Sequence, residues 1–93
     1  MTIPTCEKVI EDLEAFMRTE AYAERQRCAE ADIVANAEAI VAVIPDSEAS
    51  VALLLQLHGN RFVLMQNLSE FETSLASLRA KLLEMKERQT TPE

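Results

Sequence analysis

Turn-forming and aromatic residues are scarce in this sequence. The 93 residues include one glycine, three prolines, three phenylalanines, one tyrosine and no tryptophan. β-Sandwiches and β-barrels need many turns and strands rich in aromatic and β-branched residues, so this composition disfavours both folds. A single glycine also excludes a glycine-rich loop of the kind that cradles phosphate groups.

Histidine is almost absent, which limits the possible catalytic and metal sites. His58 is the only one, so a histidine-based metal site would need acidic residues or a second copy of the chain to complete it. Carboxylates are plentiful, but the pairs Glu11/Asp12 and Glu30/Asp32 do not converge on one helical face. No Glu-x-x-His pair occurs, which disfavours a di-iron bundle. We therefore expect no enzyme, no metal and no cofactor.

Long apolar runs are also missing. The longest are far short of the roughly 20 residues that cross a membrane, and no signal peptide is evident. The two cysteines, Cys6 and Cys28, would lie roughly 33 Å apart along an unbroken helix, too far for a disulfide. Both have apolar neighbours, so we expect two small core residues of a soluble protein in a reducing cytoplasm.

Negative charge is concentrated in the first half of the chain. Residues 1–50 hold four basic and eleven acidic side chains, whereas residues 51–93 hold five of each, and the net charge is −7. An acidic half repels phosphate backbones, so we expect no nucleic-acid partner. The simplest interpretation is a solvated acidic surface. The alternative is an acidic helix that mimics nucleic acid or docks on a basic partner.

Strong helix formers dominate what remains, and Pro45 divides them. Pro45 disfavours a helical conformation at Ile44, so the preceding helix should stop near Val43. Asp46 or Ser47 then caps the next helix. A tight connection between two long helices predicts an antiparallel helical hairpin.

Ten residues of the second half repeat at alternating spacings of three and four, the pattern of a coiled-coil seam. The repeat continues through 58–60, so we predict one long coiled-coil-like helix over 47–88. Nine of the ten are apolar and one is arginine. They are Leu54, Leu57, Arg61, Leu64, Leu68, Phe71, Leu75, Leu78, Leu82 and Met85.

Further apolar residues lie beside this seam between Val51 and Met65. A helix with so wide an apolar surface contacts more than one neighbour. The hairpin partner covers one side, and self-association is the simplest way to cover the other. The predicted interface combines both sets: Leu53, Leu54, Leu55, Leu57, Arg61, Phe62, Leu64, Met65, Leu68, Phe71, Leu75, Leu78 and Leu82.

The first half has two apolar stripes that are out of phase. One comprises Cys6, Val9, Ile10, Leu13, Phe16 and Met17, and the other comprises Ile33, Ala37, Ile40, Val41 and Ile44. The chain therefore either bends or breaks near Thr19, or shows different faces to different partners. We predict a single all-α domain over 1–93, with a short N-terminal helix over 5–18, a second helix over 20–43 and a tail over 89–93. This hairpin should assemble into a multi-helix bundle.

Arg61 is the one charged residue of the seam, and three interpretations stay open. In the first, its stem packs while its guanidinium reaches water. Taking the turn centre near residue 47, it should lie opposite Val34, where an ion pair with Glu30, Asp32 or Glu38 would fix register or oligomeric state. In the third interpretation, it binds an anionic ligand at a subunit junction.

The layout resembles small helical proteins encoded in phage and prophage genomes. The residues that carry the likeness are Leu13–Tyr22 and Leu53–Arg61, which reads Leu-Leu-Leu-Gln-Leu-His-Gly-Asn-Arg. The resemblance implies a virion-assembly or accessory component. The turn at 45–47 is also similar to hairpin proteins by which phages sequester cyclic-nucleotide immune signals. We expect a self-associating assembly, adaptor or scaffold protein of the host cytoplasm or virion; the alternative is an inhibitor of a host defence protein or nucleotide signal.

Overall fold

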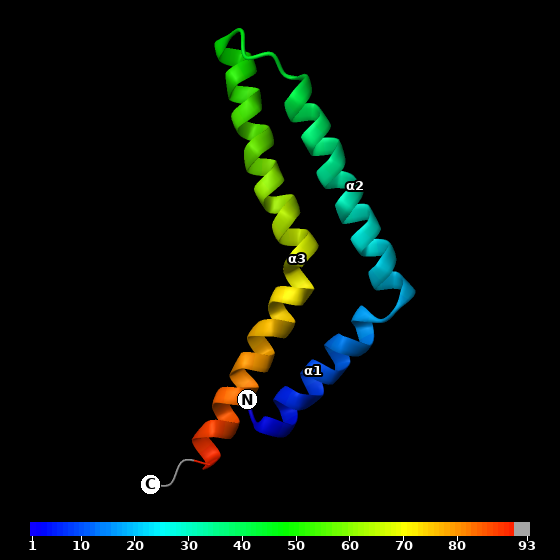
Figure 1. The fold of residues 1–93 in the computed structure, drawn as a ribbon, viewed down its shortest axis with the longest axis vertical. Coiled ribbons are helices and arrows are strands. Elements are labelled where there is room, and N and C mark those ends of the chain that lie inside the picture. Colours follow the sequence, from blue (N-terminus) through cyan, green and yellow to red (C-terminus); the bar gives the residue numbers. More distant parts are fainter. Residues whose placement is uncertain (91–93) are drawn as a thin grey trace. The chain divides into compact units, whose positions relative to one another are not determined.

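The computed structural model describes residues 1–90 and consists of three α-helices (Figure 1). They are α1 (Ile3–Met17), α2 (Glu20–Ala42) and α3 (Glu48–Thr90), and the described residues contain no strand. The expectation of an all-α protein is confirmed. α3 ends two residues later than the predicted residue 88, and residues 91–93 of the predicted tail lie outside the described residues.

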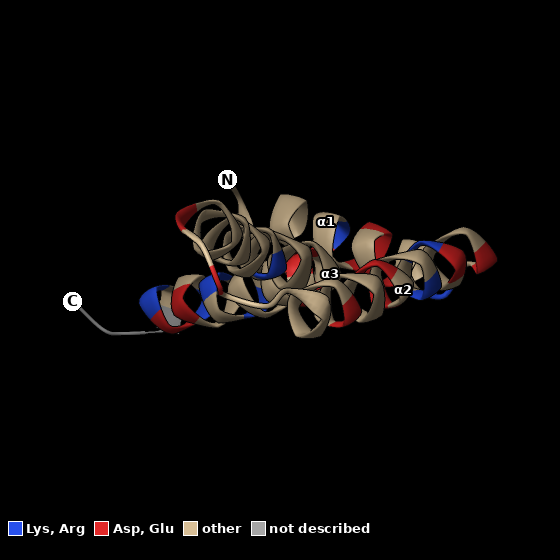
Figure 2. Cartoon of the chain, turned by 90° about the horizontal axis from the view of Figure 1, so that it is seen from above, with Lys and Arg blue, Asp and Glu red and all other residues tan. Residues whose placement is uncertain are grey.

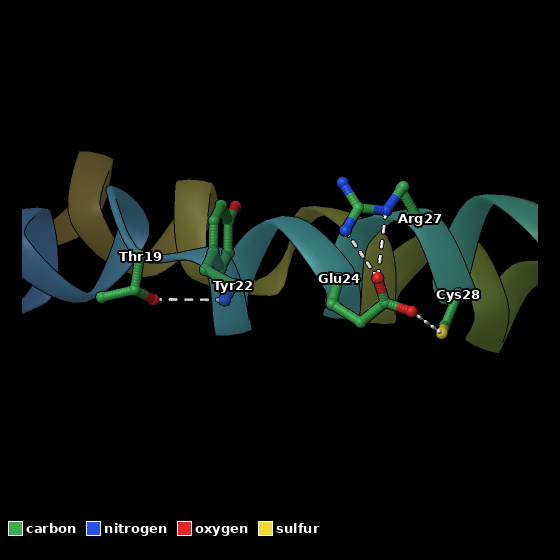
Figure 3. Close-up of polar contacts among 5 residues, drawn as sticks. All are labelled: Thr19, Tyr22, Glu24, Arg27 and Cys28. Carbon is green, nitrogen blue, oxygen red and sulfur yellow. Dashed lines mark hydrogen bonds and ion pairs between the residues drawn. The ribbon is translucent and has the colours of Figure 1, made fainter.

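The break between α1 and α2 falls at Arg18 and Thr19. Thr19 serves both helix ends, because its hydroxyl donates to the Phe16 carbonyl at 2.6 Å. The same oxygen accepts the backbone N–H of Tyr22 at 3.2 Å (Figure 3). A threonine in this position satisfies one of the free N–H groups in the first turn of α2.

Two serines cap the start of α3. The Ser50 backbone N–H donates to Ser47 Oγ at 3.2 Å, and the Ser47 backbone N–H donates to Ser50 Oγ at 3.0 Å. This reciprocal pair is a capping box in which serine replaces the usual Glu or Gln. α2 ends at Ala42, so the connection to α3 contains Pro45, as the sequence predicts.

The chain divides into two compact units. The terminal unit comprises residues 1–23 and α3 from Glu70 onward, and the turn unit comprises Glu24–Ser69. Figure 1 shows α1 beside the later part of α3 within the first unit, and α2 beside the earlier part of α3 within the second.

The terminal unit has an apolar core between α1 and α3. Cys6, Ile10 and Leu75 are buried, and the Cys6 thiol faces the Leu78 carbonyl at 3.7 Å. The prediction that Cys6 is a small core residue is therefore correct. Residues that pack around this core are Leu13, Met17, Leu78, Leu82 and Met85.

An aromatic cluster closes the terminal unit near the break. The Phe71 ring centroid lies 5.2 Å from that of Phe16 and 5.7 Å from that of Tyr22, and the last two are 5.7 Å apart. Two of the three pairs are edge-to-face, the geometry that ring quadrupoles favour. Tyr22, which the apolar pattern does not single out, is buried.

The turn unit is an antiparallel helix pair held partly by polar side chains. Gln26 donates to the Leu68 carbonyl at 2.9 Å, and Asn36 donates to the Leu57 carbonyl at 3.1 Å. Later residues of α2 therefore contact earlier residues of α3, so the two helices run antiparallel. Arg25 adds a hydrogen bond to the Asn67 carbonyl at 2.8 Å.

The interior of the turn unit differs from expectation at four positions. Asn36 is buried, although the apolar stripes pass it over. Cys28 is exposed, so its prediction as a core residue is wrong. Val41 and Ile44, counted in the apolar stripe of α2, are also exposed, at 85% and 73%. For Val41 the reason is rotational: α3 packs on the side of α2 that carries Asn36, which lies about 140° around the helix from Val41. Ile44 lies beyond the end of α2 at Ala42.

Candidate interaction surface

The structure separates the predicted interface residues into two groups by exposure. Residues of the seam are buried or half-buried under α1 or α2, whereas those beside the seam are exposed. The first group is Leu54, Leu57, Arg61, Leu64, Leu68, Phe71, Leu75, Leu78 and Leu82. The second group is Leu53, Leu55, Phe62 and Met65, each about half exposed or more. The chain covers its own seam and leaves the flank uncovered.

The exposed flank of α3 is itself a regular stripe. Val51, Leu55, Phe62 and Met65 lie at spacings of four, seven and three, and His58 fills the gap between Leu55 and Phe62. The same alternation of four and three that produces a coiled-coil seam therefore occurs a second time on this helix. Within the described residues, no other helix of the chain covers it.

Leu53 and Val63 do not belong to this stripe. At about 100° per residue, Leu53 projects from α3 on the opposite side of the seam from the stripe. Val63 projects about 120° around the helix from the centre of the stripe. Both are exposed, but they lie apart from the regular repeat. Of the four exposed residues of the predicted interface, Leu53 therefore points in one direction, and Leu55, Phe62 and Met65 point in another.

α2 carries a matching stripe at Val34, Ala37 and Val41, at spacings of three and four, and Ile44 follows in the connection after α2. Ala37 is half-buried and the other three side chains are exposed. The sequence signal was available, but grouping Val41 and Ile44 with the inward-facing Ile33 and Ile40 concealed it.

Both stripes lie on one side of the turn unit. On each helix the stripe lies roughly 110° around the helix axis from the residues that contact the other helix. Viewed from the N-terminal end, this rotation has the same sense on both helices. Because the helix axes are antiparallel, equal rotations in that sense bring the stripes to the same side. An open hollow of about 490 Å³, lined in part by Pro45, Val51 and Leu55, lies at the turn. We call the combined surface the apolar face; its members are Val34, Ala37, Val41, Ile44, Val51, Leu55, His58, Phe62 and Met65.

Charge is nearly absent from the α3 side of this face. Between Ala49 and Ser69 the only charged residue is Arg61. Figure 2 marks the acidic residues in red and the basic residues in blue along the helices. On α2 the stripe ends in charges, because the next two positions of its repeat are Glu30 and Arg27.

Arg61 is half-buried and forms no ion pair with a described residue. The contacts of Asn36 and Gln26 place it across from residues 32–33, slightly off the predicted Val34. The ion pair with Glu30, Asp32 or Glu38 is not formed within the described chain.

One polar cluster of the turn unit is local to α2 (Figure 3). Arg27 donates to Glu24 Oε2 from Nε at 3.1 Å and from its terminal nitrogen at 2.6 Å. These hydrogen bonds lower the pKa of the Glu24 carboxyl from its ordinary value. The Cys28 thiol donates to the other carboxylate oxygen at 3.7 Å. All three side chains are exposed neighbours on one helix, so the cluster encloses no substrate site.

The described part of the chain, residues 1–90, contains no group of three or more His, Cys, Asp or Glu side chains placed to hold a metal ion. It also contains no helix with the length and apolar character of a membrane span. The apolar face is therefore the surface feature that most needs an explanation.

Comparison with known proteins gives no match: no family model, no curated protein and no solved structure resembles the chain.

Proposed function

We propose that this chain is a non-enzymatic helical protein that self-associates and acts as an assembly, adaptor or scaffold component. The apolar face is the observation that carries the proposal. Its exposed fractions leave about 700–800 Å² of surface on apolar residues, more than the roughly 300–600 Å² of the largest patch on a typical monomer. Covering that surface supplies the free energy of association.

In the proposed assembly, α2 and α3 form an antiparallel hairpin that packs against another hairpin in a multi-helix bundle. α3 then makes two contacts in the turn unit, one through its seam and one through the Val51–Met65 stripe. Two heptad-spaced stripes on one helix are what a bundle interior requires, because each neighbouring helix fills one of them.

The separate terminal unit supports the adaptor and scaffold roles. Its core of Cys6, Ile10 and Leu75 lies outside the apolar face. In this proposal a second protein binds the terminal unit while the turn unit self-associates. The resemblance of Leu13–Tyr22 and Leu53–Arg61 to phage and prophage proteins supports a phage origin, with action in the host cytoplasm or the virion.

A second candidate is an inhibitor that binds a host defence protein or a nucleotide signal. The observation in its favour is the excess of acidic side chains in residues 1–50, including exposed Glu11 and Asp12 on α1. These carboxylates suit a basic protein surface better than an anionic nucleotide. Neighbouring genes separate the two candidates: capsid or portal genes favour assembly, and a cluster of small early genes favours inhibition.

The test of self-association is the molar mass in solution. Light scattering after size exclusion, at loading concentrations from about 1 to 100 µM, should give a multiple of the 10.4 kDa chain mass, because uncovered apolar surface of this size favours association. A mass of one chain at every concentration would overturn the proposal. Far-ultraviolet circular dichroism on the same samples checks that the helices are formed.

A further inference from the structure

The exposed stripe of α3 is symmetric about His58. Val51 and Met65 lie seven residues on either side of it, and Leu55 and Phe62 lie three and four residues away. Two copies of α3 that run antiparallel, with His58 beside His58, therefore bring each apolar residue of the stripe to an apolar residue of the other copy. Val51 meets Met65, and Leu55 meets Phe62.

Side-chain size favours the antiparallel direction. Each antiparallel layer combines a smaller residue with a larger one, Val51 with Met65 and Leu55 with Phe62. A parallel pair would place Phe62 on Phe62 and Val51 on Val51, so one layer would be overfilled and another underfilled. Close-packed interiors tolerate neither without strain or voids.

Charge argues against covering the α3 stripe with α2 of the second copy. If both turns lay at the same end, Phe62 and Met65 would meet the end of the α2 stripe, which is occupied by Glu30 and Arg27. Burying those charges against apolar side chains carries a desolvation cost. In the symmetric contact the α3 stripe itself meets no charged residue, and Glu30 and Arg27 fall instead opposite Val41 and Ile44 of the second copy, away from the α3 stripe.

The available area matches one partner of a stable dimer. Within each chain, the hydrogen bonds of Asn36 and Gln26 place α2 residues 35–36 at the same height along the helix pair as His58. Val34 then falls near Ala37 of the second copy, so the middle of the α2 stripe joins the contact. The α3 stripe and the middle of the α2 stripe supply most of the apolar face, which as a whole is comparable with the roughly 800 Å² that each partner contributes to an interface of standard size.

We propose that the occupant of the apolar face is a second copy of this chain, bound antiparallel with α3 against α3 across a two-fold axis at His58. This inference rests on the proposed self-association and specifies its geometry. The two imidazoles meet at the axis, where one ring N–H can donate to the unprotonated nitrogen of the other. A polar pair at one layer of an apolar seam sets the register, as a single buried Asn does in coiled coils.

Engineered cysteines test the geometry, since facing positions of two packed helices are close enough for a disulfide. All variants carry Cys28→Ser, which removes the exposed native thiol, while Cys6 is buried. Under mild oxidation, His58→Cys should give a covalent dimer. Val51→Cys alone should not, because the two copies of residue 51 lie roughly 21 Å apart.

The double variant Val51→Cys/Met65→Cys should again give covalent dimers, through bonds between unlike positions. An intrachain bond cannot form, because 14 residues of helix separate the two cysteines by roughly 21 Å. Peptide mapping that joins residue 51 to residue 65 is the expected result. Leu53→Cys, on the other side of α3, is the matched control and should not crosslink.

The outcomes separate this inference from the proposed function. If the oxidisable variants remain dimeric by light scattering but His58→Cys fails to crosslink, or Val51→Cys crosslinks to itself, the antiparallel geometry is wrong while self-association stands. If the unmodified chain has the mass of one chain at every concentration, the proposed function and the inference both fail. A 51-to-65 crosslink in a dimeric protein supports both.

Discussion

Asn36 offers a sharp test of how the turn unit is built. Its side chain is 8% exposed, and its amide nitrogen donates to the Leu57 carbonyl at 3.1 Å. Its amide oxygen has no hydrogen-bond partner among the described residues. Replacing Asn36 with Leu preserves the branching of the side chain and removes the unsatisfied oxygen. We expect a more stable protein.

The expected gain follows from three contributions. Removing an unsatisfied buried polar atom returns about 1–3 kcal/mol, and losing the hydrogen bond to the Leu57 carbonyl costs about 1 kcal/mol. Burying a leucine side chain adds about 1.5–3 kcal/mol. The free energy of unfolding should therefore rise by about 1.5 kcal/mol or more, which raises the Tm of a domain of this size by about 6–12 °C or more.

Denaturant and thermal unfolding followed by circular dichroism at 222 nm measure this change. Comparisons need equal chain concentrations, because association contributes to apparent stability. Asn60→Leu, at an exposed position of α3, is the control for helix propensity and should change stability by about 0.5 kcal/mol or less. An Asn36→Leu variant less stable than the native chain would refute the reasoning, because it would mean that the amide oxygen is satisfied in solution.

Three further predictions concern the remaining polar contacts. Arg61→Leu should raise the free energy of unfolding by about 1 kcal/mol or more, since a half-buried charge without an ion-pair partner in the described chain is replaced by an apolar residue; a lower Tm would reveal a partner carboxylate in another chain. Thr19→Ala should cost about 1 kcal/mol by removing the α2 cap, and Thr19→Ser should restore it; equal stabilities by urea denaturation would show that the cap is dispensable. Arg27→Gln should raise the pKa of the Glu24 carboxyl toward its ordinary value, as NMR titration can show. Because the native pKa is lowered, the small stabilisation from this pair is present above the ordinary pKa and is lost as the pH falls through the lowered one; an unchanged titration would contradict the assigned cause.

The seam of α3 was predictable from the sequence because one spacing rule governs it. Leucines at alternating intervals of three and four define one face of a helix whatever covers that face. The pattern carried α3 through Gly59, where composition alone suggests a loop. A Cβ at Gly59 would meet nothing within 4 Å, which agrees with its outward position.

The α2 face was harder to predict, because its residues give ambiguous signals. Ala, Ile and Val occur on several sides of α2, so the choice of the inward side depends on which contacts α3 makes. Asn36 lies inward because its amide reaches the Leu57 carbonyl, a tertiary contact that periodicity cannot reveal. Cys28 was assigned to the core from its apolar neighbours, but the antiparallel register turns it outward.

The mass of two neighbouring variants tests the central claim most directly. Phe62 belongs to the apolar face and is 65% exposed, whereas Val63 is 52% exposed on another side of the same helix. Phe62→Glu should sediment as a single chain at a concentration where the native protein is a dimer, because association would bury the new carboxylate. Val63→Glu should keep the native mass, with helical content unchanged in both. If Phe62→Glu retained the native mass, or if both variants dissociated equally, self-association through the apolar face would be contradicted.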